Sequence, residues 1–421
     1  MVKEIKIEDF DYELPDEAVA KYPLEKRDDC RLIVRTPEGR ISHRKFGELP
    51  ALLPSGTMMV CNDTKVIKAR LLFHKESGAA IEIFLLEPLA PADYALSFQS
   101  NESCTWKCMV GNLKKWKDGD LHMEILDTET GESVTLHARR KETLPEGGVA
   151  VEFYWNNPSE TFSSLTERAG RIPIPPYLHR ESEESDLTDY QTVYAMAQGS
   201  VAAPTAGLHF TPEVFEGLKD HDIPVRKLTL HVGAGTFRPV KSDTIGEHDM
   251  HSERFTVTVG LLEDLIEWKR AGKPVAAVGT TTVRTLESLP LIADAIREGR
   301  KNPLHVEQWD AYSLKDDFNT VEALEFLAGY MKERGMRELS ASTSIMIAPG
   351  FRWRITDILV TNFHQPKSTL LLLVSSFLET SGDFDEWRRL YEEALKQGYR
   401  FLSYGDACLL FRAGGSKKYG V

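Results

Sequence analysis

Residues 225–236 read VRKLTLHVGAGT, a pattern that predicts a β-strand running directly into a loop. Leu228 and Leu230 alternate with Thr229 and His231, which is the spacing of a strand with one buried face. His231 is therefore expected to point away from the face that buries the leucines.

The loop after this strand carries two glycines, Gly233 and Gly235, followed by Thr236. Glycine has no side chain to keep a ligand away from the main-chain N–H groups, so the loop is suited to close contact with a ligand. It is not the dinucleotide-binding fingerprint, because the third glycine is missing and Pro239 stands where a helix would have to begin. A Rossmann-type site is excluded here.

Residues 200–253 include the histidines His209, His231, His248 and His251. Such a cluster suits general acid–base work or hydrogen bonding to a polar ligand. The alternative is an open zinc site, in which the i, i+3 pair His248 and His251 would be joined by one of the other two. No carboxylate or thiolate spacing supports the zinc site, so we expect no metal.

Three further buried strands are predicted to end in polar residues, after Cys61, Val278 and Val360. Polar side chains at the end of a buried strand are a usual place for ligand contacts. We therefore expect a large α/β domain, a mixed sheet or open barrel with helices, with its site along one edge of the sheet. Asp63, after the first of these strands, either holds a hydroxyl or an amine of a ligand or caps its own turn.

A helix is predicted to begin at the threonines Thr280, Thr281 and Thr282, directly after the second of these strands. Free N–H groups and the positive end of a helix beside hydroxyls form a receptor for a carboxylate or a phosphate. Arg284 either pairs with a ligand carboxylate or with Glu287, three residues further along the helix.

Between residues 70 and 158 the pattern changes to short β-rich runs separated by turn residues. The predicted strands are Ile81–Leu86, Tyr94–Phe98, Trp106–Val110, Leu121–Ile125, Val134–Ala138 and Val149–Trp155. Strands at this spacing indicate a small all-β barrel, inserted into a large discontinuous domain made of residues 1–69 and 159–421. Trp106 and Trp116 either fill the barrel core or form an aromatic, basic surface for RNA.

The composition is that of an ordinary globular chain of 421 residues with a net charge of -13. This charge argues against nonspecific nucleic-acid binding over the whole surface, and leaves only local basic clusters such as Arg139–Lys141 as candidate contacts. No apolar run approaches the ~20 residues of a membrane helix and no signal peptide opens the sequence, so a cytoplasmic protein is expected. The five cysteines are scattered without a CxxC motif, which predicts free thiols.

Eight strings spread over nearly the whole chain carry a family resemblance. They are RDDCRLIV (27–34), NDTKVIKARL (62–71), VAAPTAGLHF (201–210), TLHVGAGTFRPV (229–240), HDMHSE (248–253), VGTTTVRTLES (278–288), APGFRWRITDILVTNFHQPKSTLLLLVSSF (348–377) and YRFLSYGDACLLF (399–411). In this order they resemble the signatures of the S-adenosylmethionine:tRNA ribosyltransferase-isomerase (QueA) family of queuosine biosynthesis. Motifs so long and so numerous are highly specific.

The resemblance implies a transferase that moves the ribosyl part of S-adenosylmethionine onto the aminomethyl group of a 7-deazaguanine in tRNA, giving epoxyqueuosine and releasing adenine and methionine. S-adenosylmethionine would be a cosubstrate, with no prosthetic group and no metal, and the tRNA anticodon stem-loop would be the partner. A large α/β domain with an inserted β-barrel is also implied. A site formed by one chain is compatible with a monomer, which we expect.

The family motifs locate residues for this chemistry, and their roles are hypotheses. His209 and His231 are expected to transfer protons, and His251 or His364 to protonate the departing adenine. Asp63 is expected to orient the amine or the ribose. The residues expected to bind the donor are Thr280, Thr281, Thr282 and Arg284 at the methionine carboxylate, Gly233, Gly235 and Thr236 at the nucleoside, and Asn362.

Two segments depart from the usual family pattern. Residues 102–120, ESCTWKCMVGNLKKWKDGD, lack the proline-glycine and lysine pattern that commonly follows a tryptophan there, and Leu304–Ser344 is longer than its family counterpart. Both segments lie outside the expected catalytic site, in regions where a macromolecular partner would be recognised. The alternatives are therefore a paralogue that uses the same donor on a different acceptor, or a tRNA-binding protein without turnover. Retention of every histidine-bearing motif argues against the second.

Overall fold

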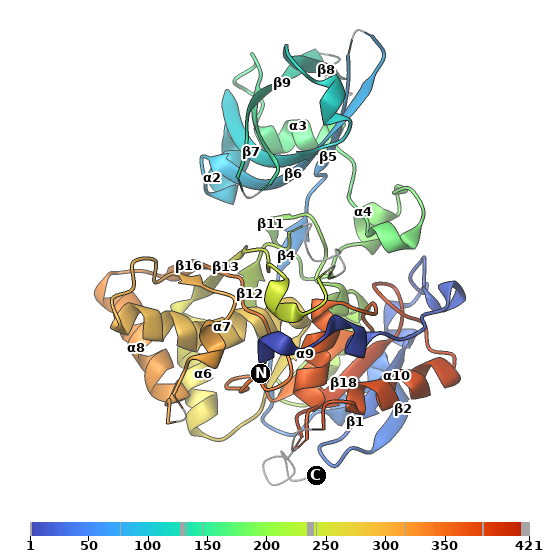
Figure 1. Ribbon diagram of the computed structural model, residues 1–421, viewed down its shortest axis with the longest axis vertical. Coiled ribbons are helices and arrows are strands. Elements are labelled where there is room, and N and C mark those ends of the chain that lie inside the picture. The colour runs from blue at the N-terminus through green and yellow to red at the C-terminus, as the bar shows by residue number, and fades with distance from the viewer. Residues whose placement is uncertain are drawn as a thin grey trace.

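A ten-stranded mixed sheet and a smaller six-stranded sheet organise the computed structural model (Figure 1). The structure describes residues 2–75, 77–126, 131, 133–145, 147–233, 240, 242–315, 317–380 and 383–413. The large sheet and its helices form the lower part of the view in Figure 1, and the small sheet stands above them. A sheet of mixed direction with helices, together with a small all-β part, agrees with the predicted fold class.

The large sheet has the order β15-β16-β13-β12-β3-β14-β17-β18-β1-β2. Its strands are β1 (Arg31–Arg35), β2 (Ile41–Lys45), β3 (Met58–Asn62), β12 (Val225–Leu230), β13 (Glu253–Thr258), β14 (Val275–Val278), β15 (His305–Val306), β16 (Glu338–Thr343), β17 (Ile358–Asn362) and β18 (Ala407–Phe411). The central neighbours β12, β3, β14 and β17 all run parallel. Their carboxyl ends therefore meet at one edge, as the sequence predicted for three of them.

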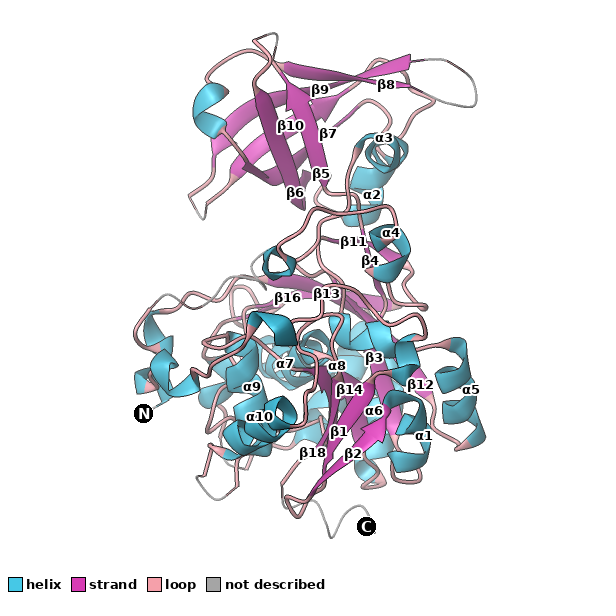
Figure 2. Ribbon diagram, turned by 90° about the vertical axis from the view of Figure 1, so that its right-hand side faces the viewer, coloured by secondary structure: helices cyan, strands magenta, loops and turns pink. Residues whose placement is uncertain are grey.

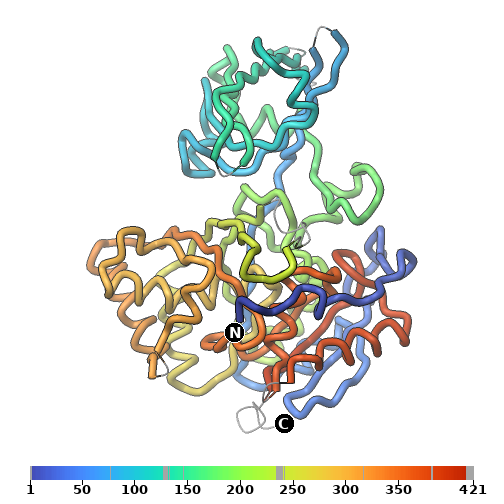
Figure 3. The backbone as a smooth tube through the Cα atoms, viewed as in Figure 1, coloured from blue at the N-terminus to red at the C-terminus, as the bar shows by residue number. Residues whose placement is uncertain are grey.

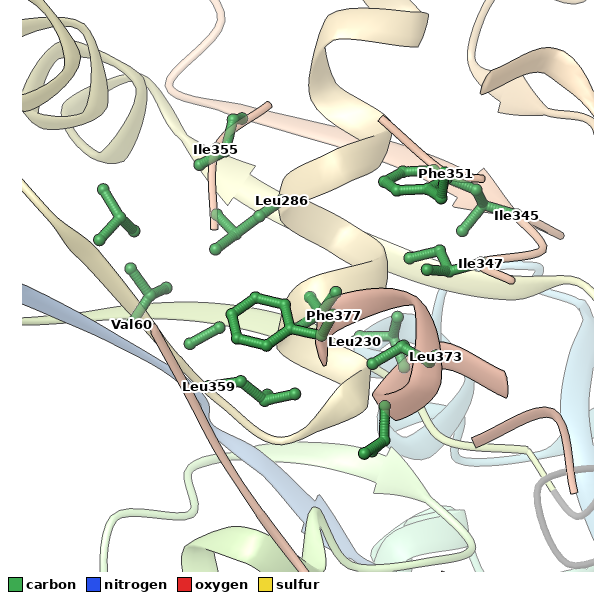
Figure 4. Close-up of a cluster of buried hydrophobic side chains, with 14 of the residues drawn as sticks. Val60, Leu230, Leu286, Ile345, Ile347, Phe351, Ile355, Leu359, Leu373 and Phe377 are labelled. Atoms are coloured by element: carbon green, nitrogen blue, oxygen red, sulfur yellow. The ribbon is translucent and has the colours of Figure 1, made fainter. Parts of the chain in front are cut away.

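Successive residues of the central strands enter two different cores, because side chains alternate between the faces of a sheet. Met58 and Val60 pack into one core, and Met59 and Cys61 into the other. Burial on both faces explains why β3, β14 and β17 are almost continuous apolar runs. Figure 4 shows part of the first core, in which Val60 of β3 lies among side chains from β17, the helices and the loop after β16.

Helices cover both faces of the large sheet (Figure 2). One core includes α6 (Val259–Arg270), α7 (Thr280–Arg297), α8 (Thr320–Glu333), α9 (Thr369–Leu378) and α10 (Glu386–Lys396), and the other includes α1 (Leu49–Leu52) and α5 (Pro212–Asp220). The N-terminal segment, blue in Figure 3, lies beside the C-terminal helix α10, where the rings of Phe10 and Trp387 stack at 5.9 Å. In the described part of the chain, no helix has the length and apolarity needed to cross a membrane.

The small sheet is antiparallel throughout, in the order β5-β6-β7-β10-β9-β8. Its strands are β5 (Arg70–His74), β6 (Ala80–Ala90), β7 (Ser103–Val110), β8 (Leu121–Leu126), β9 (Ser133–Thr143) and β10 (Val149–Tyr154). The two edge strands, β5 and β8, approach each other, so the sheet curls into a nearly closed barrel. Trp106 and Trp116 are both fully buried in its core. The alternative of an RNA-binding surface built on these tryptophans is therefore wrong.

One predicted strand of the barrel is a helix. Tyr94–Phe98 belongs to α2 (Tyr94–Gln99), and the Asp93 carboxylate caps it by accepting the Leu96 N–H at 3.0 Å. The apolar spacing of this short run fits both periods, and the capping aspartate decides between them.

The chain leaves the large sheet for the barrel and returns to it at nearly the same place. The parallel strands β4 (Thr64–Val66) and β11 (Ala197–Ser200) flank this junction, and Arg70 and Arg171 exchange backbone hydrogen bonds of 3.2 and 2.9 Å across it. The helices α3 (Phe162–Ala169) and α4 (Asp186–Asp189) lie on the return path. The division into 1–69 with 159–421 and 70–158 stays a prediction.

Candidate functional site

A pocket opens at the carboxyl ends of β14 and β17. Its enclosed volume is about 70 Å³, below the ~300–1,000 Å³ of sites that enclose a whole small ligand, so a larger ligand would extend out of it. Its walls are Ala202–Ala206, Gly279–Thr281, 361–365, Leu402, Ser403, Tyr177, Val232, Ser368 and Leu370. Segments far apart in the sequence thus converge on one cavity, which we call the sheet-edge pocket.

The first turn of α7 forms one wall of the sheet-edge pocket. Gly279 precedes it with a φ of +83° and ψ of 158°, a conformation that side chains strongly disfavour. Thr280 and Thr281 line the pocket, whereas the Thr282 hydroxyl turns inward and donates to the Val278 carbonyl at 2.6 Å. The first N–H groups of a helix have no partner within it, so this wall carries partial positive charge.

Asn362, at the end of β17, lines the same pocket and connects it to His209. Its side-chain nitrogen lies 2.8 Å from His209 Nε2 and donates to the Leu402 carbonyl at 3.2 Å. His209 is only 4% exposed, and its Nδ1 lies 3.4 Å from the Cys30 thiol. Burial, reinforced by the charges of two arginines, lowers the pKa of His209 to about 3.

His364 is the histidine that lines the sheet-edge pocket itself. Its Nε2 lies 3.0 Å from the Thr361 hydroxyl, and its backbone N–H donates to the Tyr391 hydroxyl at 3.0 Å. Burial lowers its pKa to about 3, so the imidazole is neutral at physiological pH.

The sequence comparison fits this convergence of motifs. The sequence model of a family described as "Queuosine biosynthesis protein" matches residues 7–410. The chain belongs to this family.

Curated members of the queuosine family resemble this chain over nearly its whole length. A protein of Pelobacter propionicus named S-adenosylmethionine:tRNA ribosyltransferase-isomerase is 37% identical, over 96% of this chain and 99% of its own. One of the same name from Moorella thermoacetica is 38% identical, over 96% and 100%. The crystal structure of an S-adenosylmethionine tRNA ribosyltransferase from Thermotoga maritima is 30% identical over 96% of this chain and 99% of its own, with a TM-score of 0.45.

In this queuosine-family chain, Arg284 pairs with a residue that the sequence did not single out. Its guanidinium forms a buried ion pair with Glu253, and donates to the Thr343 carbonyl at 3.4 Å. The expected alternative partner Glu287 instead accepts three backbone N–H groups, including that of Thr356 at 2.8 Å. The pairing of Arg284 with Glu287 is therefore wrong, because Arg284 and Glu287 each have other fixed partners.

Glu253 gathers three groups around one buried carboxylate. Besides Arg284, His251 Nε2 lies 3.2 Å from Glu253 Oε1, and the Gly233 N–H donates to that oxygen at 3.3 Å. Burial disfavours the charged form, but these partners outweigh it and lower the pKa of Glu253 to about 2. Gly233 thus lies beside His251 as well, whereas the predicted contacts Gly235 and Thr236 lie outside the described residues.

His231 and Asp63 face a different space from the sheet-edge pocket. Both line a wide cleft between the large sheet and the barrel, as does Tyr94 of α2, whose ring stacks on His231 with centroids 4.0 Å apart. Burial lowers the pKa of His231 to about 4. Burial also raises the pKa of Asp63, although the Thr229 hydroxyl bonds its carboxylate at 2.7 Å and partly offsets this effect. Val232, the next residue, lines the sheet-edge pocket, so the predicted alternation of this strand is confirmed.

The predicted site residues therefore fall into three groups. Thr280, Thr281, Asn362 and His364 line the sheet-edge pocket, and His209 lies behind Asn362. Arg284, His251 and Gly233 surround Glu253, and Asp63 and His231 line the cleft. Thr282 lies in the interior. Among the residues that the structure describes, no three His, Cys, Asp or Glu side chains are placed to hold a metal ion.

Two residues of the site were not predicted. Glu253 lies in the string HDMHSE, but its partner Arg284 is 31 residues away and only the fold brings the two together. Asn62 donates to the Leu230 carbonyl at 3.0 Å and to the Thr281 hydroxyl at 3.3 Å, which ties the start of α7 to β12. The sequence signal for Asn62 is its place at the end of a buried strand, directly before Asp63.

Proposed function

We propose that this chain transfers and isomerises the ribosyl moiety of S-adenosylmethionine onto the aminomethyl group of a 7-deazaguanine in tRNA, giving epoxyqueuosine and releasing adenine and methionine. The observation that carries the proposal is the sheet-edge pocket. Its walls come from the family strings around residues 201–206, 278–281, 361–370 and 402–403. Strings that define the family thus surround one cavity.

The donor is proposed to bind at the sheet-edge pocket, with part of it extending beyond the enclosed space. The N–H groups at the start of α7 suit a carboxylate, which S-adenosylmethionine carries at its methionyl end. The apolar loop Ala202–Ala206 and Val232 suit the nucleoside part. The anticodon stem-loop, as the form of tRNA that is recognised, and a monomeric enzyme remain part of this proposal.

The reaction requires a base next to the sulfonium. The base removes a proton from the carbon beside sulfur, adenine leaves with that electron density, the tRNA amine attacks, and a ribose oxygen closes the epoxide as methionine departs. His364 is proposed as the base, because it lines the pocket and its neutral imidazole accepts a proton that it can pass to adenine. A neutral His231 is proposed to take the proton from the attacking amine, with Asp63 orienting that amine.

The experiment that tests this function combines the purified protein, S-adenosylmethionine and an anticodon stem-loop carrying the aminomethyl-deazaguanine. Adenine release together with an RNA mass gain of one epoxycyclopentane unit is expected. Adenine release or donor binding without any change of this RNA would favour a paralogue that acts on a different acceptor. RNA binding without donor binding would favour a tRNA-binding protein without turnover.

A further inference from the structure

The orientation of the Asn362 amide is fixed by the backbone around it. Leu402 presents a carbonyl oxygen 3.2 Å from the amide, and an oxygen there requires a donor. The nitrogen of the amide must therefore occupy this side, and the same nitrogen lies 2.8 Å from His209 Nε2. Nε2 is consequently the acceptor, because an amide nitrogen only donates.

Both ring nitrogens of His209 therefore have a partner, Asn362 at Nε2 and Cys30 at Nδ1. With Nε2 accepting, the ring proton of the neutral imidazole resides on Nδ1, which faces the Cys30 sulfur at 3.4 Å. The ring also packs on Phe46, with centroids 5.3 Å apart. At 4% exposure, with its partners fixed on both sides, His209 has no free nitrogen to offer to a substrate.

The oxygen of the Asn362 amide is left without a partner among the residues that the structure describes. The side chain is 2% exposed and lines the sheet-edge pocket. A buried acceptor without a hydrogen bond is unfavourable, so a bound group that donates to this oxygen is expected to bind more tightly than one that does not.

Negative charge is favoured close to this free acceptor. Asn362 ends β17 and Thr280 follows the neighbouring parallel strand β14, and adjacent strands lie ~4.8 Å apart. The start of α7 attracts an anion, whereas the Asn362 oxygen attracts a donor such as an ammonium. An α-amino acid presents both groups on a single carbon. Arg284 is not the anion's partner here, because Glu253 already holds it.

We propose that the sheet-edge pocket binds the amino-acid end of the donor, with its carboxylate at the N–H groups of Thr280 and Thr281 and its ammonium on the Asn362 oxygen, and that His209 is a positioning residue that holds Asn362 rather than a carrier of protons. The assignment rests on the proposed function in taking S-adenosylmethionine as the donor. It deepens that function by naming which end of the donor lies where.

The first test compares two probes that differ at the amino-acid end. S-adenosylhomocysteine carries the carboxylate and ammonium, and 5′-methylthioadenosine carries neither. Calorimetric titration of the full chain is expected to show that Asn362→Ala weakens the affinity for S-adenosylhomocysteine roughly 10–100-fold, as for a lost hydrogen bond to a charged group. The affinity for methylthioadenosine should stay within twofold of that of the unmutated protein. An equal loss of affinity for both probes would contradict this assignment and leave the proposed function intact. Binding of neither probe to the unmutated protein would overturn the proposed function and the assignment together.

The second test separates positioning from proton transfer at His209. The amide oxygen of His209→Gln can accept the Asn362 N–H in place of Nε2, so this variant is expected to keep adenine release within about threefold and an unchanged pH profile. His209→Ala is expected to lose affinity for S-adenosylhomocysteine selectively. If His209→Gln were as inactive as His209→Ala while melting at the same temperature as the unmutated protein, the positioning role would be wrong. The exposed His221→Ala is the control for loss of an imidazole.

Discussion

The histidines near the site are held in surroundings that suppress their charge. Burial lowers the pKa of His209 and His364 to about 3 and that of His231 to about 4. These imidazoles are neutral at physiological pH, so none has an acidic proton to give before it has taken one. A histidine motif therefore does not by itself imply a group that titrates near neutrality.

Replacing His364 by Gln is expected to remove part of the acid sensitivity of the fold. Below the ordinary histidine pKa of ~6.5, the unfolded chain binds a proton that the folded chain refuses until about pH 3. The stability of the unmutated protein therefore falls with pH in this window, by up to ~1.4 kcal/mol per pH unit from this residue. Urea unfolding between pH 7 and 4 should show a shallower decline for His364→Gln. Parallel profiles would contradict the prediction.

Glu253→Gln is expected to destabilise the fold by ~3–5 kcal/mol at pH 7, because it leaves the buried Arg284 without its counter-charge. The pKa of Glu253 is depressed to about 2, so its stabilisation is complete above the ordinary glutamate pKa of ~4.5 and is lost as pH falls toward 2. Unfolding curves should therefore differ most at neutral pH and converge in acid. The double variant with Arg284→Met should recover much of the loss, and a further loss instead would argue against a coupled pair.

At the scale of the element, the start of α7 depends on a backbone conformation as much as on its threonines. Gly279 takes a φ of +83°, and a Cβ added there would lie 3.6 Å from Ala206 of the opposite pocket wall. That distance is an ordinary van der Waals contact, so the positive φ and not a lack of space is what favours glycine at this position. The same turn exposes the helix N–H groups to the pocket.

Gly279→Ala is expected to cost ~1–3 kcal/mol of stability and to weaken donor binding at least tenfold, because the strained turn shifts the N–H groups at the start of α7. The matched control is Gly272→Ala, at a φ of +66° after α6, where an added Cβ meets nothing within 4 Å. The control should lose a similar stability but keep its affinity for S-adenosylhomocysteine. Equal affinities for both variants would contradict a special role of the turn.

At the scale of the whole molecule, the barrel touches the large sheet at the cleft. Tyr94 of α2 stacks on His231, and a Cβ on Gly199 of β11 would lie only 2.6 Å from each of these rings. Three elements from both parts therefore meet at one aromatic contact. A proposed acceptor site in the cleft depends on this contact for its shape.

Tyr94→Ala is expected to raise the KM for tRNA roughly 2–10-fold, since an aromatic pair contributes about 0.5–1.5 kcal/mol beyond its buried area. Donor affinity should not change, because Tyr94 does not line the sheet-edge pocket. Tyr94→Phe keeps the ring and should behave like the unmutated protein. Steady-state kinetics with varied stem-loop and saturating donor measure the effect. A change in donor affinity instead would contradict the assignment of the Tyr94–His231 contact to the acceptor site.

Much of this architecture could be predicted because short stretches of sequence determine it. The buried runs ending at Cys61, Val278 and Val360 predicted neighbouring strand ends, since apolar strands buried on both faces belong to the centre of a sheet. The pairing of Arg284 with Glu253 could not be predicted, because it depends on which strand lies beside α7. His231 and Val232 were assigned to opposite faces correctly, but nothing local indicates that one face meets the barrel and the other the pocket.

Strand β18 lies between β17 and β1, although it follows all other described strands in the sequence. Among the described strands, β18 alone connects the pair β1 and β2 to the rest of the sheet, so this pair cannot join the sheet before β18 does. The barrel strands, by contrast, pair with near neighbours in sequence and can assemble while synthesis continues. The orientation of the Asn362 amide depends on the same part of the chain, because the amide donates to the carbonyl of Leu402, just before β18. The sheet-edge pocket is thus complete only when the segment before β18, whose Leu402 and Ser403 also line it, has taken its place.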